Sequence, residues 1–293
     1  MLSALALLLT MVPALGVSTA VADTADTSWF ADAKYGISAG VLNALQNNAD
    51  AVPSGGAQTR WDTCVNEFDA ELFALQAAQT GADYVLLTLQ QADRYFCAPN
   101  KTYTNLIKKA GVDAADACAT RDLPMELANA LSRRGIKLML YVTADGPWKD
   151  TEVFEQALGG EINEASHVPP VIVADNVGSE ASANFKKNWL AVIEEFAARY
   201  GSMVAGWWVD GADGAKWSAT ELQNFADMLK TYNGSAVISF NAGSAELAPR
   251  YYVAADDFTA GESTYFDDYP EAKYLDSDNT PTDKGGAQWH ILS

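Results

Sequence analysis

Short apolar runs alternate with amphipathic stretches along most of the chain, which is the pattern of strands and helices taken in turn. We predict strands at residues 35–41, 84–89, 136–142, 204–209, 236–240, 258–260 and 288–292. The run at 84–89 is apolar throughout, as a strand buried on both faces requires. Because strands that alternate with helices form parallel sheets, the pattern predicts an α/β fold of the (β/α)8 TIM-barrel type.

Capping residues mark the ends of the helices between these strands. Asp69 and Gly81 bracket one helix, whose spacing predicts that Leu72, Leu75 and Ala78 face the core. The sequence therefore predicts a helix with a leucine-rich buried face before the second strand.

Two later helices carry equally clear signals. One follows Asp122 and buries Leu127 and Leu131, and the other opens with a capping box at Ser218. Residues 143–179 show little periodicity and predict a long loop over one end of the barrel.

The two ends of the chain bear on its organisation. Residues 2–12 form an apolar run too short to span a bilayer, and the small residues at 20–22 fit a signal-peptidase site. We therefore expect a signal peptide at residues 1–22 and a secreted chain, residues 23–293, that forms one barrel domain. The lack of Lys and Arg before the apolar run leaves a retained anchor as the alternative. We expect a barrel that is incomplete at its last strand or closes differently.

The charge balance narrows the classes of partner. The 293 residues include 19 Lys and Arg against 38 Asp and Glu, a formal net charge of −19. Such a chain is repelled by a phosphate backbone and by an anionic membrane surface. We expect no nucleic-acid partner and, after removal of the signal peptide, no membrane partner.

Three cysteines in an exported chain suggest a disulfide bond. We predict a bridge between Cys97 and Cys118, because both lie between the same two predicted strands, and this leaves Cys64 unpaired. No C-x-x-C or His-rich cluster supports a zinc site.

The residues that follow the strands form an acid-, amide- and aromatic-rich rim, and catalytic groups in a (β/α) barrel lie at that end. Amides and carboxylates bind hydroxyl groups, and aromatic faces pack on sugar C–H surfaces, so we predict a carbohydrate ligand. The candidate sugar contacts are Trp61, Gln91, Asp93, Tyr95, Tyr141, Trp208 and Asn241. For Trp61, a place in the core or under a loop is an equal alternative.

Two carboxylates from different strands are the basic equipment of most glycosidases. Asp210 and Glu262 supply such a pair. The structural alternatives are a turn aspartate before a glycine for Asp210 and a solvated rim glutamate for Glu262. If Glu262 lies too far from Asp210, the next acids to consider are Asp257, Asp256 and Glu246.

Short motifs stand in series at residues 35–37, 68–70, 81–88, 121–123, 134–141 and 208–211. In order and rough spacing, this series resembles glycoside hydrolase family 29, the α-L-fucosidases. The family's nucleophile is the aspartate of its W-x-D-G stretch, which falls on Asp210, and residues 257–262 resemble the segment that carries its acid/base glutamate. The resemblance implies a retaining exo-glycosidase with Asp210 as nucleophile and Glu262 as acid/base. This chemistry needs neither a metal nor an organic cofactor, and we expect none.

The sequence departs from this family at its histidines. Family members place a histidine after the first strand, where this chain has Gly40 or a neighbour, and a Lys-His-His-Asp-Gly-Phe run after the second, where it has residues 90–95. His290 is a candidate replacement for one of them, with a packed strand histidine as the alternative. A non-catalytic carbohydrate-binding barrel and an inactive fragment therefore remain rival interpretations.

Overall fold

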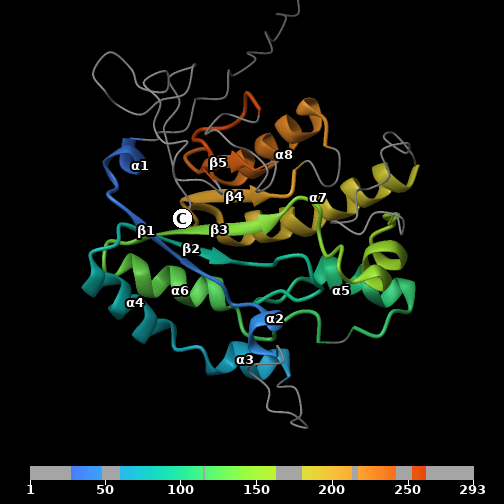
Figure 1. The fold of residues 1–293 in the computed structure, drawn as a ribbon, viewed down its shortest axis with the longest axis horizontal. Coiled ribbons are helices and arrows are strands. Elements are labelled where there is room, and N and C mark those ends of the chain that lie inside the picture. Colours follow the sequence, from blue (N-terminus) through green and yellow to red (C-terminus); the bar gives the residue numbers. More distant parts are fainter. Residues whose placement is uncertain are drawn as a thin grey trace, which may run out of the picture.

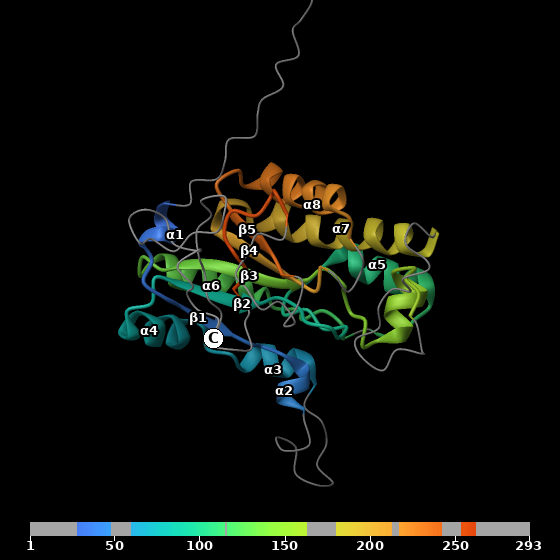
Figure 2. The ribbon, with the colours of Figure 1, turned by 45° about the horizontal axis from the view of Figure 1, so that its top comes forward.

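The computed structural model describes residues 28–47, 60–114, 116–162, 180–212, 217–241 and 253–261. Five parallel strands form one open sheet whose order follows the chain, and Figures 1 and 2 show them side by side. The strands are β1 (Gly36–Ala39), β2 (Tyr84–Thr88), β3 (Lys137–Thr143), β4 (Gly206–Asp210) and β5 (Val237–Phe240). All five lie within the ranges that the apolar runs predict, or one residue beyond them.

The closed barrel is not confirmed, because the sheet in the described part of the chain is open and has five strands. The predicted strand at 258–260 is not a strand in the structure, and the one predicted at 288–292 lies outside the described residues. The signal peptide predicted at residues 1–22 also lies outside them. What the structure shows is an α/β fold built on a parallel sheet.

Helices occupy most of the connections between strands. They are α1 (Ser28–Asp32), α2 (Asn43–Gln46), α3 (Trp61–Glu67), α4 (Ala70–Thr80), α5 (Lys101–Ala110), α6 (Leu123–Ser132), α7 (Glu180–Tyr200) and α8 (Ala219–Tyr232). A short π-helix, Glu152–Ala157, lies within the segment predicted to be a loop, and a 3₁₀ turn, Gly201–Met203, follows α7. No helix in the described part of the chain is both long and apolar enough to cross a membrane.

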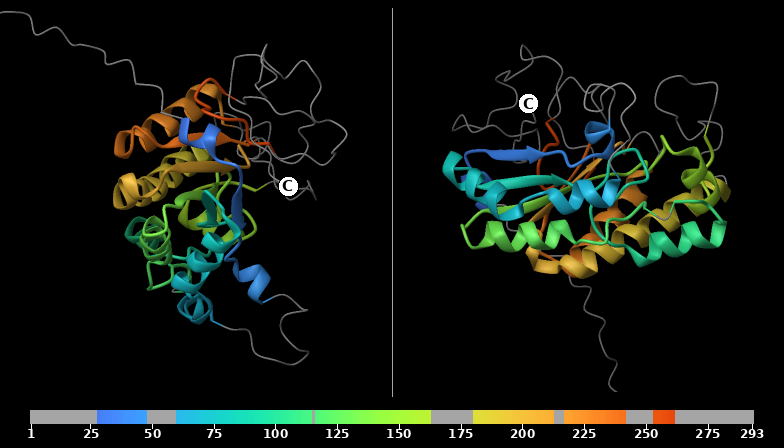
Figure 3. Two further views of the ribbon diagram at one scale, coloured as in Figure 1. Left: turned by 90° about the vertical axis from the view of Figure 1, so that its left-hand side faces the viewer. Right: turned by 90° about the horizontal axis from the view of Figure 1, so that it is seen from below.

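The two faces of the sheet bury different apolar clusters because successive side chains of a strand point to opposite faces. Leu87, Leu140 and Trp207 belong to the larger cluster, which includes the buried faces of α4 to α8. Figure 3 shows these helices together on one side of the sheet. Met139 and Trp208 belong to a smaller cluster on the other face. The smaller cluster lies on the side of the sheet that a barrel would enclose.

Two predicted helix starts are confirmed by their caps. The Asp122 side chain accepts a hydrogen bond from the Met125 amide at the start of α6, and Leu127 and Leu131 are buried. Ser218 and Glu221 form the predicted capping box of α8. These local signals were sufficient because each depends on a few neighbouring residues.

The buried face of α4 differs from the prediction. Asp69 and Gly81 cap the helix as expected, but the residues that face the core are Ala70, Ala74 and Ala77. Leu72 and Leu75 are 49% and 44% exposed. Both sets of residues have helical spacing, and the small alanines let α4 approach α6 closely. The prediction that Leu72, Leu75 and Ala78 face the core is therefore wrong.

The outer edge of β5 is covered by side chains where a barrel would have another strand. The Asp257 carboxylate accepts a hydrogen bond of 2.9 Å from the Ile238 amide, and the Asp256 carboxylate accepts one of 2.8 Å from the Phe240 amide. Lys230 of α8 lies 3.0 Å from the Asp257 carboxylate. Segment 253–261 therefore provides hydrogen-bond partners for the backbone amides of this edge through carboxylates.

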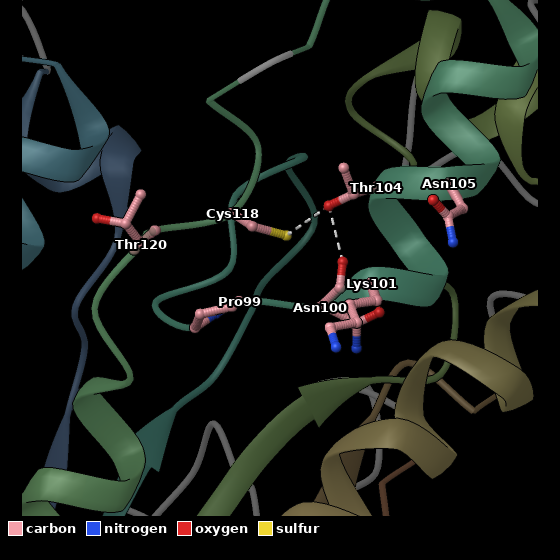
Figure 4. Close-up of a pocket in the computed structure, with 8 residues that line it drawn as sticks. Pro99, Asn100, Lys101, Thr104, Asn105, Cys118 and Thr120 are labelled. Carbon is pink, nitrogen blue, oxygen red and sulfur yellow. Dashed lines mark hydrogen bonds between the residues drawn. The ribbon is translucent and has the colours of Figure 1, made fainter.

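The predicted Cys97–Cys118 disulfide bond is absent, and both of these cysteines are thiols. Phe96 pairs with Cys118 as a parallel bridge, so the next side chain, Cys97, points to the opposite side. The Cys97 thiol is buried 3.7 Å from the Thr88 carbonyl. Cys118 instead faces Thr104 in a groove of about 470 Å³ beside the first turn of α5 (Figure 4).

Candidate functional site

Polar side chains meet where β3, β4 and β5 end. The register pairs Tyr141 with Trp208 and Thr143 with Asp210, and Asn241 directly follows β5. Because parallel strands end at the same edge of a sheet, these residues come together although they lie far apart in the sequence. This end of the sheet is the candidate site.

Three donors hold the carboxylate of Asp210. The Tyr141 hydroxyl donates a hydrogen bond of 2.5 Å to Oδ2, and the Asn241 amide donates one of 2.9 Å to Oδ1. The backbone amide of Gly211 donates a further bond of 2.8 Å to Oδ1. Together these donors fix the orientation of the Asp210 carboxyl group. We refer to Tyr141, Asn241 and the Gly211 amide as the Asp210 donors.

The Tyr141 hydroxyl is itself oriented by a neighbour. Gln91, after β2, donates a hydrogen bond of 2.9 Å to the Tyr141 oxygen, which leaves the hydroxyl proton free to bind Asp210. Burial, followed by the charge on Asp210, raises the pKa of Tyr141 above its ordinary value. Tyr141 therefore remains a donor across the physiological pH range.

The ring of Trp208 packs against the ring of Tyr141. Their rings are stacked with centroids 5.1 Å apart, and the Trp208 indole donates a hydrogen bond of 3.1 Å to the Ala260 carbonyl. Trp208 is only 1% exposed. The predicted sugar contact is thus a buried residue that positions Tyr141 and anchors segment 253–261 on this face of the sheet.

A second carboxyl, Asp145, lies beside Asp210. Its carboxyl group packs on Gly211, where an added Cβ would lie 2.7 Å from Oδ2 and 2.8 Å from Oδ1. Burial, followed by the charge on Asp210, raises the pKa of Asp145 to about 8. Asp145 is not among the residues predicted from the sequence, although an Asp-Gly pair two residues beyond β3 repeats the pattern of Asp210 and Gly211.

Comparison with known proteins shows the family of this chain. The family model for alpha-L-fucosidase matches residues 57–280, which is more than half of the chain. The chain belongs to the alpha-L-fucosidase family. No curated protein matches the sequence.

Solved structures of an α-L-fucosidase and of an endo-fucoidan hydrolase share the fold. A mutant of the α-L-fucosidase AlfC in complex with 4-nitrophenyl-α-L-fucopyranoside substrate has a TM-score of 0.52 at 18% identity, over 87% of this chain and 74% of that one. AlfC comes from Lactobacillus casei. An endo-fucoidan hydrolase of glycoside hydrolase family 107 has a TM-score of 0.51 at 16% identity, over 78% of this chain and 62% of that one. The structures support the fold, and the family match supports a glycosidase at the level of the family.

Residues 90–95 stand where the family has its Lys-His-His-Asp-Gly-Phe run, and the two glutamines of this segment have structural partners here. Gln90 accepts a hydrogen bond of 3.1 Å from the Thr143 hydroxyl and donates one of 2.7 Å to the Asp93 carbonyl. Gln91 contacts Tyr141, as described above. The two glutamines therefore tie the end of β2 to the end of β3.

The structure brings three of the other predicted residues to the same side of the molecule but not to Asp210. Burial raises the pKa of Asp93 to about 6, and Oδ1 of Asp93 accepts a 3.2 Å hydrogen bond from the Tyr95 amide. Tyr95 packs against Trp61, with ring centroids 5.7 Å apart. Trp61 is 1% exposed and donates its indole proton to the Phe96 carbonyl, so the core alternative fits it and the sugar contact does not.

The predicted acid/base, Glu262, lies outside the described residues, as do Glu246 and His290. The described chain reaches Gly261, one residue before Glu262, and the Trp208 bond to Ala260 holds that segment on the face that carries Asp210. The alternative acid candidates Asp256 and Asp257 accept hydrogen bonds from backbone amides of β5 instead.

Proposed function

We propose that this chain is a secreted retaining glycosidase that removes a terminal sugar, with α-L-fucosides as the first substrates to test. The observation that carries the proposal is the set of Asp210 donors, which hold a half-buried carboxylate at the carboxyl end of a parallel sheet. Barrel enzymes carry their catalytic groups at that end. Membership of the alpha-L-fucosidase family supports the choice of substrate.

In this mechanism Asp210 attacks the anomeric carbon of the sugar, and the leaving oxygen departs with a proton from Glu262. A covalent glycosyl-enzyme forms on Asp210, and Glu262 then takes a proton from the water that cleaves it. The Asp210 donors fix the direction of the attacking oxygen, which lowers the entropic part of the activation free energy of the reaction. A retaining enzyme requires the two carboxyls to be about 5–5.5 Å apart, which defines where Glu262 must lie.

The nucleophile is tested with the Asp210→Ala variant on 4-nitrophenyl α-L-fucopyranoside. We expect kcat to fall by about 10⁴-fold, because the covalent step is lost. Added azide should partly restore cleavage by attacking from the vacated space and should give a glycosyl azide of inverted configuration. Product analysis by NMR spectroscopy identifies that azide.

The Asp113→Asn variant is the matched control, because Asp113 is exposed and its bond to Arg94 uses the backbone carbonyl, which the substitution keeps. It should retain wild-type kcat. If the wild type binds L-fucose but cleaves no nitrophenyl glycoside between about pH 4 and pH 8, the chain is a sugar-binding protein and the proposal fails.

A further inference from the structure

Asp145 occupies an unusual position for a carboxyl group. Its Oδ1 atom is buried and has no hydrogen-bond partner among the residues that the structure describes. The group is pressed against Gly211, which is the residue after Asp210 and has a φ of +66°. An ionised carboxylate with a buried, unpaired oxygen costs far more free energy than a neutral carboxylic acid in the same place.

The charges around Asp145 also favour its neutral form. Asp210 faces it from β4 and Tyr141 from β3, and the Thr143 hydroxyl, the backbone amide of Asp145 and Lys149 are further polar neighbours. Burial and Asp210 raise its pKa more than Thr143 and Lys149 lower it, to about 8. Asp210 has three donors within hydrogen-bond distance, so a single negative charge is stabilised better on Asp210 than on Asp145.

We propose that Asp145 is a positioning residue that keeps its proton at neutral pH, so that the Asp145–Asp210 pair carries one negative charge and that charge stays on Asp210. Two carboxyls whose surroundings differ in this way separate into an acid and a carboxylate. The Gly211 backbone connects them, because it supplies one of the Asp210 donors and the surface on which Asp145 packs.

The consequence for catalysis rests on the proposed function. When Asp145 ionises at alkaline pH, a second negative charge appears beside Asp210 and repels it from the Tyr141 and Asn241 donors. The rate of attack on the sugar should then fall as Asp145 loses its proton. Asp145 itself does not touch the reacting atoms in this account.

The proton on Asp145 can be measured without any activity. In protein labelled with ¹³C at the aspartate carboxyls, one resonance should titrate near pH 8 and should be missing from the Asp145→Asn variant. In Asp210→Asn the same resonance should titrate about 1–3 pH units lower, because the neighbouring charge has gone. An Asp145 resonance that titrates near pH 4, or that does not move in Asp210→Asn, would overturn the proposal.

The effect on catalysis is measured as the ratio of kcat/KM at pH 9 to that at pH 6.5 on 4-nitrophenyl α-L-fucopyranoside. This leaving group needs little general acid, so the ionisation of Glu262 contributes little to the ratio. We expect the wild type and Asp113→Asn to lose about tenfold between these pH values and Asp145→Asn to lose much less. Equal ratios in all three would refute the catalytic role. If the wild type cleaves nothing, the proposed function fails while the NMR titration still decides the protonation of Asp145.

Discussion

At the scale of single residues, two Asp-Gly pairs after neighbouring strands have opposite surroundings. Asp210 receives three hydrogen bonds, whereas the buried Oδ1 atom of Asp145 has no partner among the described residues. Residue type and position in a turn are the same in both cases. The difference arises from what the rest of the fold brings to each carboxyl, and this is how one fold can assign different protonation states to similar residues.

Gly211 contacts both carboxyls, because its amide binds Asp210 and the Asp145 carboxyl packs on it. Its replacement tests the contact with Asp145. We expect Gly211→Ala to lower the free energy of unfolding by about 1–2 kcal/mol for its positive φ and by about 1–3 kcal/mol more for the clash with Asp145. Gly111→Ala is the matched control, since Gly111 has a φ of +75° and open space around it. Urea unfolding monitored by circular dichroism gives both values.

Adding Asp145→Ala to Gly211→Ala should recover the part of the loss that exceeds the Gly111→Ala control, because the clashing atoms are removed. If Gly211→Ala costs no more than Gly111→Ala, Asp145 does not press on Gly211.

Part of the site could be predicted from the sequence. The rule that catalytic groups follow strands found Asp210, Tyr141, Asn241 and Gln91, because each strand end is visible as the end of an apolar run. It missed Asp145, since the segment after β3 has no periodicity and was interpreted as a loop from residue 143 onward. Burial was also not predictable, because the sequence alone does not tell whether an aromatic residue near a strand end lies in the core or on the rim.

At the scale of elements, the helix α4 shows what periodicity alone leaves undecided. Leu72 is 49% exposed on α4, and Leu127 is fully buried on α6. We expect Leu72→Ala to change the free energy of unfolding by less than about 0.5 kcal/mol and Leu127→Ala to lower it by about 2–5 kcal/mol. Chemical denaturation of the two variants measures the difference, and a similar loss in both would place the leucine face of α4 in the core after all.

The strands and caps were predictable because they depend on local sequence. An apolar run of four to six residues and an Asp or Ser before a helix are both complete signals within one turn or strand. The sheet edge was not predictable in this way. Residues 258–260 have strand-like composition, but the edge of β5 is satisfied by the side chains of Asp256 and Asp257, and only tertiary structure decides between backbone and side-chain partners.

At the scale of the whole molecule, pH acts on stability through two different mechanisms. The chain has a formal net charge of −19, so its negative side chains repel one another. Lowering the pH reduces this repulsion, and salt screens it. Asp93 and Asp145, whose pKa values are raised by burial to about 6 and about 8, keep protons in the folded protein that the unfolded chain has lost. Stability therefore falls as pH rises from about 4 to about 8.

The two mechanisms can be separated by salt and by the Asp145→Asn variant. Unfolding of the wild type releases protons across this range, so its melting temperature should decrease from pH 5 to pH 8, by the equivalent of a few kcal/mol for Asp145, on the order of its pKa shift. The decrease should persist at high salt, because a buried proton is not screened. In Asp145→Asn most of the decrease should disappear at high salt, while Asp113→Asn should follow the wild type.

Below about pH 4 the trend should reverse, because Glu195 and Glu221 have lowered pKa values in the folded protein and lose their stabilising ionised form there. If the wild type and Asp145→Asn have the same pH dependence at high salt, Asp145 does not hold a proton that the unfolded chain releases.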